Sequence, residues 1–137
     1  MASLVRLWPA PNPGDIVWCH FPQVPGTPGP KPRPALVVAV DDSNKKNVRV
    51  EVAYGTSQKT NRLYPGEFLI SKLDNLDAYK LAGLSYDTKF DLNRTFQLPY
   101  NSDWFGVAPT PLGQNPRLGT LHPSLVPALS AAYAKTR

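Results

Sequence analysis

Apolar and polar positions along the first hundred residues follow patterns that predict short β-strands. The clearest pattern starts at Arg33, continues as an apolar run over 35–40 and returns, after a polar turn, through the alternating segment 48–52. A continuous apolar run is typical of a buried strand, and strict alternation is typical of a half-buried one. We therefore expect an antiparallel hairpin, which places Arg33 and the hydroxyl pair Thr56 and Ser57 at the same end of the sheet.

The same patterns predict further strands and two helices. Strands are expected over 16–21, 67–70, 88–92 and 94–98. Apolar residues at helical spacing, with turn residues at their ends, predict a short helix over 74–81 and a final helix over about 123–135. Together these elements predict a mainly β fold with short helices (α+β), curved into a small barrel onto which the C-terminal helix packs.

The sixteen prolines gather near the two ends of the chain and limit its helix content. Residues 1–13 are expected to form a proline-stiffened arm, and residues 14–137 a single domain, since this length is sufficient for one hydrophobic core. The proline-rich segment 99–121 is expected to be loop-like, with Trp104 and Phe105 as its anchor to the body.

Composition narrows the classes of function. The net charge of +5 favours an anionic partner, most commonly nucleic acid, although many basic domains bind nothing acidic. Cys19, the single cysteine, excludes an internal disulfide and alternates onto the apolar side of its strand, as an inert core thiol would. The chain shows no Cys/His cluster with zinc spacing, no signal peptide and no stretch of about 20 apolar residues. We therefore expect no metal, no cofactor, no membrane contact and a cytoplasmic location.

Several segments together resemble the PemK/MazF family of bacterial toxins. They occur in the family's order and with similar spacing: Gly14-Asp15-Ile16-Val17-Trp18-Cys19-His20-Phe21, Arg33-Pro34-Ala35-Leu36-Val37-Val38, Thr56-Ser57-Gln58, and 91–96. The combination is more specific than any one piece and covers most of 14–98. The resemblance implies an SH3-like barrel that forms a homodimer. It also implies the toxin of a type II toxin–antitoxin system, a metal-independent endoribonuclease that cleaves single-stranded RNA and is inhibited by a small antitoxin protein.

The resemblance also implies roles for individual residues. Arg33 falls on the family's catalytic arginine, and Thr56 falls on the hydroxyl residue that helps to hold the scissile phosphate, with Ser57 and Gln58 beside it. A guanidinium is a poor base but a good fixed charge, so Arg33 is expected to stabilise the transition-state phosphate. The two hydroxyls would donate hydrogen bonds to its non-bridging oxygens.

Proton transfer has two candidate groups. Cleavage by the ribose 2′-hydroxyl needs a base and an acid, and Asp91 is the base that the resemblance implies. Lys89 falls on the arginine of the family's Arg-x-Asp pair, where it keeps the charge but loses the bidentate fork. His20 titrates in a suitable range; alternatively it is a strand residue that faces solvent or a dimer partner. The loop segment 26–31 lacks the acidic or histidine residue that many family members carry there.

Other side chains have two readings each. Lys31, Lys59 and Arg62 either follow the RNA backbone or form a solvated basic face. Trp18 and Trp104 either stack on RNA bases or belong to the core or a dimer interface. For the whole protein, the alternative to a nuclease is a catalytically inactive barrel of the same lineage that binds nucleic acid or protein.

Overall fold

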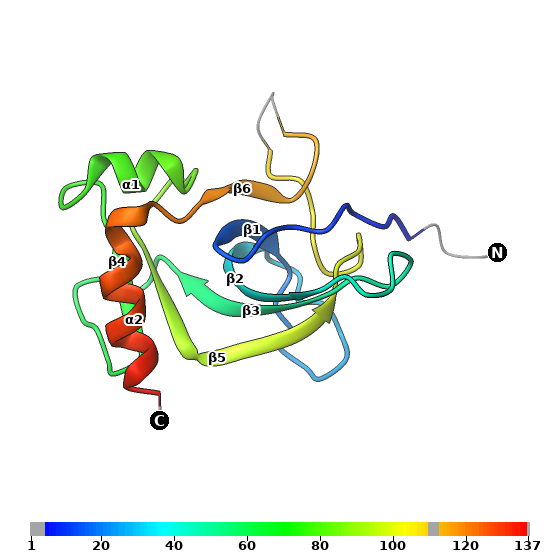
Figure 1. Cartoon of the computed structure of the whole chain (residues 1–137), viewed down its shortest axis with the longest axis horizontal. Coiled ribbons are helices and arrows are strands. Elements are labelled where there is room, and N and C mark those ends of the chain that lie inside the picture. Colours follow the sequence, from blue (N-terminus) through cyan, green and yellow to red (C-terminus); the bar gives the residue numbers. More distant parts are fainter. Residues whose placement is uncertain (1–4, 110–112, 137) are drawn as a thin grey trace.

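The protein is built on a curled antiparallel β-sheet (Figure 1). Its structure is a computed structural model that describes residues 5–109 and 113–136. Over these residues the strands are β1 (Asp15–Cys19), β2 (Arg33–Asp41), β3 (Arg49–Thr56), β4 (Glu67–Ile70), β5 (Thr88–Pro99) and β6 (Arg117–Thr120). Their order across the sheet is β4-β5-β3-β2-β1-β6. The expected mainly β class with short helices is confirmed.

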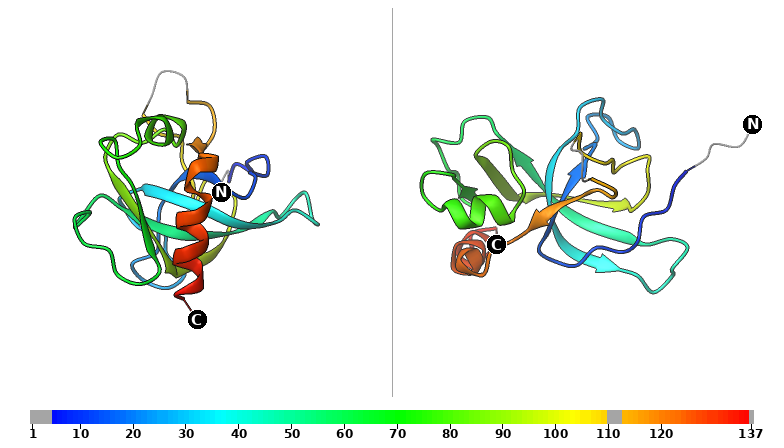
Figure 2. Two further views of the ribbon diagram at one scale, coloured as in Figure 1. Left: turned by 60° about the vertical axis from the view of Figure 1, so that its left-hand side comes forward. Right: turned by 90° about the horizontal axis from the view of Figure 1, so that it is seen from above.

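The helices lie together at one end of the sheet, away from the hairpin that joins β2 to β3 (Figure 2). They are α1 (Leu76–Leu81), the short 3-10 helix η1 (Pro123–Leu125) and α2 (Val126–Ala134). Helix α1 starts two residues later than expected, because the side chain of Asn75 caps it by accepting from the backbone N–H of Ala78 at 3.1 Å.

The curl gives the sheet a hydrophobic core on each face. Because side chains alternate along a strand, β1, β2 and β3 contribute to both cores. One core contains Trp8, Val17, Cys19, Ala35, Val37, Val52 and Phe105. The other contains Ile16, Leu36, Ala53, Phe90, Ala78 from α1 and Ala132 from α2. Burial on both faces explains why the β2 sequence is an almost uninterrupted apolar run.

Strand β5 corrects the expectation of two separate strands over 88–92 and 94–98. The chain is one continuous strand whose pairing with β3 shifts between Tyr54, opposite Asp91, and Ala53, opposite Thr95. The three residues 92–94 have no partner on β3 and form a bulge. A bulge bends a strand without ending it, so β5 pairs with β3 along its length and with β4 at its start.

The segment 99–121 is not entirely loop, because it contains β6, which pairs with β1. Its expected anchor is present: Phe105 is fully buried and Trp104 is half-buried. The indole Nε1 of Trp8 donates to the carbonyl oxygen of Phe105 at 2.9 Å, so the described part of the N-terminal arm is held against this segment. Residues 1–4 of that arm and residues 110–112 lie outside the described part of the chain.

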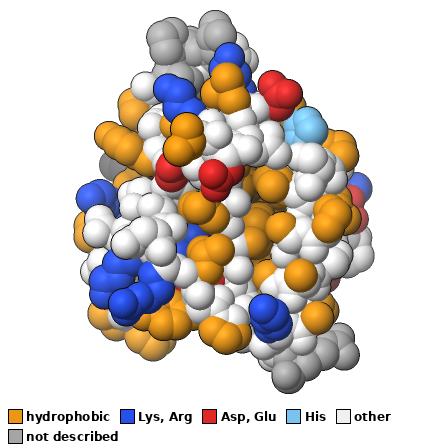
Figure 3. Space-filling model, turned by 90° about the vertical axis from the view of Figure 1, so that its left-hand side faces the viewer, with side chains coloured by type: hydrophobic (Ala, Val, Ile, Leu, Met, Phe, Trp, Pro, Cys, Tyr) orange, Lys and Arg blue, Asp and Glu red, His pale blue; other side chains and the backbone are white. Residues whose placement is uncertain are grey.

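Helix α2 packs against β4 and leaves a hollow of about 530 Å³ between them. Apolar side chains gather in this hollow on the face shown in Figure 3; its lining includes Leu63, Phe68, Ala128 and Ala131. The apolar residues at helical spacing that predicted the last helix are Leu125, Leu129, Ala132 and Tyr133, and they were expected to pack against the sheet. Leu125 and Ala132 are buried and Leu129 is half-buried, but Tyr133 is 54% exposed, contrary to that expectation.

Candidate functional site

The start of β2 and the end of β3 lie side by side at one end of the sheet. Ala35 pairs with Tyr54, and extending this register by two residues places Arg33 opposite Thr56. Gly55 permits the close approach of the two strands, because a Cβ at this position would overlap the carbonyl oxygen of Pro34. The fold therefore brings the guanidinium-bearing and hydroxyl-bearing positions together.

A pocket of about 520 Å³ opens at this end of the sheet. Five of the predicted site residues line it: Lys31, Arg33, Thr56, Ser57 and Gln58. Both charged residues that line its described part, Lys31 and Arg33, are basic. Cations and hydroxyl-bearing residues that line one pocket are groups that can bind a phosphate.

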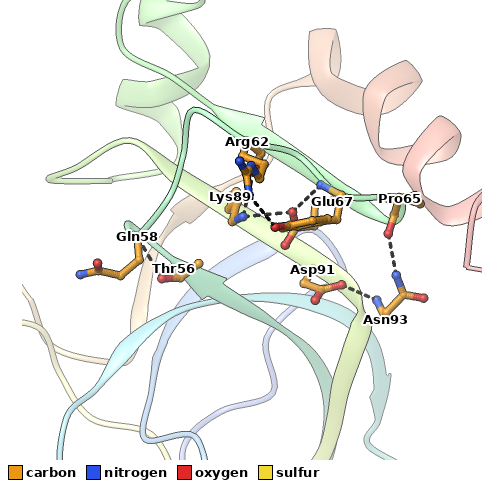
Figure 4. Close-up of polar contacts among 9 residues, drawn as sticks. Thr56, Gln58, Arg62, Pro65, Glu67, Lys89, Asp91 and Asn93 are labelled. Atoms are coloured by element: carbon orange, nitrogen blue, oxygen red, sulfur yellow. Dashed lines mark hydrogen bonds and ion pairs between the residues drawn. The ribbon is translucent and has the colours of Figure 1, made fainter.

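Thr56 is held in a defined conformation. Its Oγ1 accepts a hydrogen bond from the backbone N–H of Gln58 at 3.0 Å (Figure 4). Because the hydroxyl oxygen is the acceptor in this turn, its hydrogen remains available to donate to a ligand. Thr56 can therefore act as a hydrogen-bond donor to a phosphate oxygen.

Lys89 is placed in the interior, outside the pocket. Its Nζ lies 3.0 Å from Glu67 Oε1, and the two side chains are only 6% and 9% exposed. It also donates to the carbonyl oxygen of Arg62 at 3.0 Å (Figure 4). The ammonium group is thus engaged in holding β4, β5 and the preceding loop together.

Asp91 lies on the same face of the sheet as Thr56 but does not line the pocket. Asp91 pairs with Tyr54 on β3 and with Glu67 on β4. Thr56 pairs with Lys89, which precedes Asp91 by two residues on β5. Two residues along a strand correspond to about 7 Å. The Oδ1 of Asp91 accepts from the backbone N–H of Asn93 at 2.9 Å (Figure 4).

The ring of Tyr54 contacts two arginines. The Cζ atom of Arg33 lies 5.8 Å from the ring centroid and that of Arg94 lies 4.1 Å from it, both within cation–π range. The ring of Phe21 meets it edge-on, with centroids 5.0 Å apart. Sequence reasoning did not single out Tyr54. The signal that could have found it is its place two residues before Thr56, hence on the same face of β3.

His20 lies outside the pocket lining and supports the loop that leads to Arg33. Its Nδ1 is 2.9 Å from the carbonyl oxygen of Gly29, so the ring holds this loop as an Nδ1–H donor. A Cβ on Gly29 would overlap the carbonyl oxygen of Phe21, so the same loop lies closely against the chain just after β1. His20 thereby positions the chain that carries Lys31.

The other predicted residues do not gather at the pocket. Lys59 and Arg62 are exposed on the loop between β3 and β4, where Arg62 Nη1 donates to the hydroxyl of Tyr64 at 3.3 Å. Cys19 is fully buried, and burial raises the pKa of its thiol, as expected of an inert core residue. Over the described residues, no His, Cys, Asp and Glu side chains cluster as a metal site would require. No helix there has the length and apolar character needed to cross a membrane.

None of the curated proteins matches this chain. The family model for the PemK-like, MazF-like toxins of type II toxin–antitoxin systems matches residues 12–102. The match runs from the turn before β1 to just beyond β5, and it includes Arg33, Thr56 and Asp91. It covers well over half of the 137 residues. The chain therefore belongs to the family of PemK-like, MazF-like toxins of type II toxin–antitoxin systems, a membership that implies an antitoxin partner.

Proposed function

We propose that this protein is a toxin that acts as a metal-independent endoribonuclease on single-stranded RNA. The observation that carries the proposal is the shared pocket of Arg33, Thr56 and Ser57, whose lining combines a fixed positive charge with two hydroxyl-bearing residues. Such a lining suits a phosphate whose negative charge increases in the transition state. Family membership supports the toxin role.

The proposed reaction uses the ribose 2′-hydroxyl as the nucleophile on the adjacent phosphorus. Arg33 neutralises the charge on the phosphorane, and Thr56 and Ser57 donate to its non-bridging oxygens. The base takes the proton of the 2′-hydroxyl, and the bond between phosphorus and the 5′ oxygen breaks as the new bond to the 2′ oxygen forms. The 5′ oxygen leaves as a hydroxyl after taking a proton from solvent, and the other product carries a 2′,3′-cyclic phosphate. DNA lacks the nucleophile and is not cleaved.

Asp91 is the proposed base. Its strand partner on β3, Tyr54, precedes Thr56 by two residues. Tyr54, the strand partner of Asp91 on β3, supports the guanidinium of Arg33 through a cation–π contact with its ring. We further propose that the protein acts as a homodimer in the cytoplasm and that its antitoxin inhibits it by occupying the RNA-binding surface.

A second candidate function is that of a catalytically inactive barrel that binds nucleic acid or protein. The observation that favours it is that neither Asp91 nor His20 lines the pocket with Arg33. The loop 26–31, which enters the pocket at Lys31, also carries no acid or histidine. Binding without cleavage would then be the protein's function.

Incubation of the purified protein with RNA in the presence of a chelator distinguishes the nuclease from the inactive binding module. A nuclease gives fragments that end in 2′,3′-cyclic phosphate, and Arg33→Ala abolishes them. Thr56→Val, which removes the hydroxyl but keeps the branched shape, lowers the rate about 10²–10³-fold, whereas Thr56→Ser retains most of it. Intact RNA after incubation with wild-type protein would overturn the proposal and support the binding module.

A further inference from the structure

The bulge at residues 92–94 of β5 follows directly on Asp91, the proposed base. Asp91 itself pairs with both neighbouring strands, with Tyr54 on β3 and with Glu67 on β4. Bulges are common next to active sites, where they change the direction of a side chain. We propose that Asn93, in the middle of this bulge, is a positioning residue that aims the carboxylate of Asp91. The inference rests on the proposed function, because it needs Asp91 to act as the base.

The backbone of Asn93 fixes one oxygen of the carboxylate. Its N–H donates to Asp91 Oδ1 at 2.9 Å (Figure 4). Within the described part of the chain this is the one hydrogen bond that the carboxylate accepts, so Oδ2 keeps its lone pairs for a proton. Because Oδ1 is held, the carboxylate does not turn freely about its own bonds, and the direction of Oδ2 is set. A defined position is the first requirement of a general base.

The side chain of Asn93 ties the bulge to the turn before β4. Its Nδ2 donates to the carbonyl oxygen of Pro65 at 2.8 Å (Figure 4). The amide lies so close to this turn that a Cβ on Gly66 would overlap Nδ2, and the φ of +92° at Gly66 favours glycine. The carbonyl oxygen of Gly66 accepts from the N–H of Leu92 at 2.9 Å. Two consecutive bulge residues are therefore tied to the turn, and the N–H that holds Asp91 is tied with them.

Arg94, the last residue of the bulge, is held against β3. Its Cζ atom lies 4.1 Å from the centroid of the Tyr54 ring, within cation–π range. Tyr54 is the β3 partner of Asp91, so this contact anchors the bulge beside the same carboxylate. The turn before β4 and the ring on β3 thus replace the strand pairing that the bulge lacks. The N–H of Asn93 is fixed between these two anchors.

Asparagine suits this position because its side chain donates a hydrogen bond. An amide nitrogen is a donor, whereas an ionised aspartate only accepts and leucine does neither. Asn93 is exposed and adds no apolar surface to either core, so its replacement should not unfold the protein. The alternative role is that of a clamp that only stabilises the turn. The two roles differ in whether the loss of Asn93 acts through the carboxylate of Asp91.

A double-mutant cycle on the single-turnover rate of RNA cleavage tests this dependence. Asn93→Leu keeps a similar shape and removes the donor. We expect it to lower the rate at saturating protein about ten-fold, with little change in the protein concentration that gives half the maximal rate. In Asp91→Asn protein, which lacks the base, the same substitution should have no further effect. Equal fold-losses in the two backgrounds would overturn the positioning role, because independent effects add in free energy.

Asn44 provides the matched control. It is exposed in the turn between β2 and β3, where its Oδ1 accepts from the N–H of Lys46 at 3.0 Å. Asn44→Leu therefore also removes one side-chain hydrogen bond from a turn, and it should cleave RNA at the wild-type rate. A rate as low as that of Asn93→Leu would show that any loosened turn impairs cleavage, which overturns the specific role of Asn93.

Hydrogen exchange of the backbone N–H of residue 93, followed by NMR, reports the bond to Asp91 without any need for cleavage. Exchange should become faster in Asn93→Leu, after correction for the intrinsic effect of the side chain, and stay unchanged in Asn44→Leu. Unchanged exchange in Asn93→Leu would overturn the positioning role. Wild-type protein that does not cleave RNA rejects the nuclease and the positioning role with it. Cleavage at the wild-type rate by Asn93→Leu rejects the positioning role alone.

Discussion

Lys89 and Glu67 form an ion pair that is almost completely shielded from solvent. The Nζ and Oε1 atoms are 3.0 Å apart, and the same Oε1 accepts from the backbone N–H of Tyr64 at 2.7 Å. Lys89 also donates to the carbonyl oxygen of Arg62. The pair therefore anchors the end of the loop 57–66, whose first two residues line the pocket.

Breaking this pair from one side should destabilise the protein strongly. Lys89→Met leaves the Glu67 carboxylate buried without its counter-charge, which typically costs about 3–5 kcal/mol in the free energy of unfolding. The double variant Lys89→Met/Glu67→Leu should recover a large part of that loss, as urea denaturation of the four proteins in the cycle would show. If the two single effects simply add, the pair is not coupled. If the double variant is stable and still cleaves RNA, the role of Lys89 is structural. If the double variant is stable but has lost cleavage, Lys89 is a substrate ligand.

Gly55 sets the distance between β2 and β3 at the pocket. In Gly55→Ala the new Cβ would overlap the carbonyl oxygen of Pro34 and crowd the ring of Phe90, so the strand ends must separate. We expect a loss of about 1–3 kcal/mol in the free energy of unfolding, together with a fall in RNA cleavage measured well below the melting temperature. Gly106→Ala is the control, because its Cβ would meet only His20 Nε2 at an ordinary 3.7 Å. Equal effects in the two variants would contradict the close-approach argument.

Tyr54 is expected to position Arg33 through its ring. Tyr54→Leu removes both cation–π contacts, each worth about 0.5–1 kcal/mol at an exposed site, and should lower kcat/KM for RNA several-fold. Tyr54→Phe keeps the ring and should retain nearly wild-type kcat/KM. A Tyr54→Leu protein that is less stable but cleaves at the wild-type rate would show that Tyr54 serves only the packing around Phe21.

The sequence predicted the parts of the site that depend on local pairing. The hairpin brings the start of β2 beside the end of β3 even though its register shifts by one residue between Val37 and Ala39. The apolar run after Arg33 and the alternation before Thr56 were therefore sufficient to place these two residues at one end of the sheet. The contacts of Lys89 could not be predicted in this way, because its partner Glu67 is placed by the pairing of β4 with β5. That pairing follows from the tertiary fold.

Two features of the fold escaped the sequence patterns for a related reason. Strand β6 has only four residues, one of them Gly119. It pairs with β1, which is about 100 residues away in the sequence, and the two strands share the Asp15–Arg117 ion pair at 3.3 Å. The bulge at 92–94 interrupts the alternation of β5, so one strand looked like two. Leu118, which lines the pocket from β6, could therefore not be predicted as a pocket residue from the sequence.

Asp91 is the residue on which the proposed proton transfer depends. Asp91→Asn keeps an oxygen that can accept from the N–H of Asn93, so the fold should be unchanged while the carboxylate base is lost. We expect the single-turnover rate of RNA cleavage to fall about 10²–10⁴-fold. His20→Gln is the comparison, since its ring supports the loop at Gly29 and its loss should change the rate much less. The reverse result, with Asp91→Asn active and His20→Gln inactive, would transfer the role of the base to His20, since imidazole is a common general base.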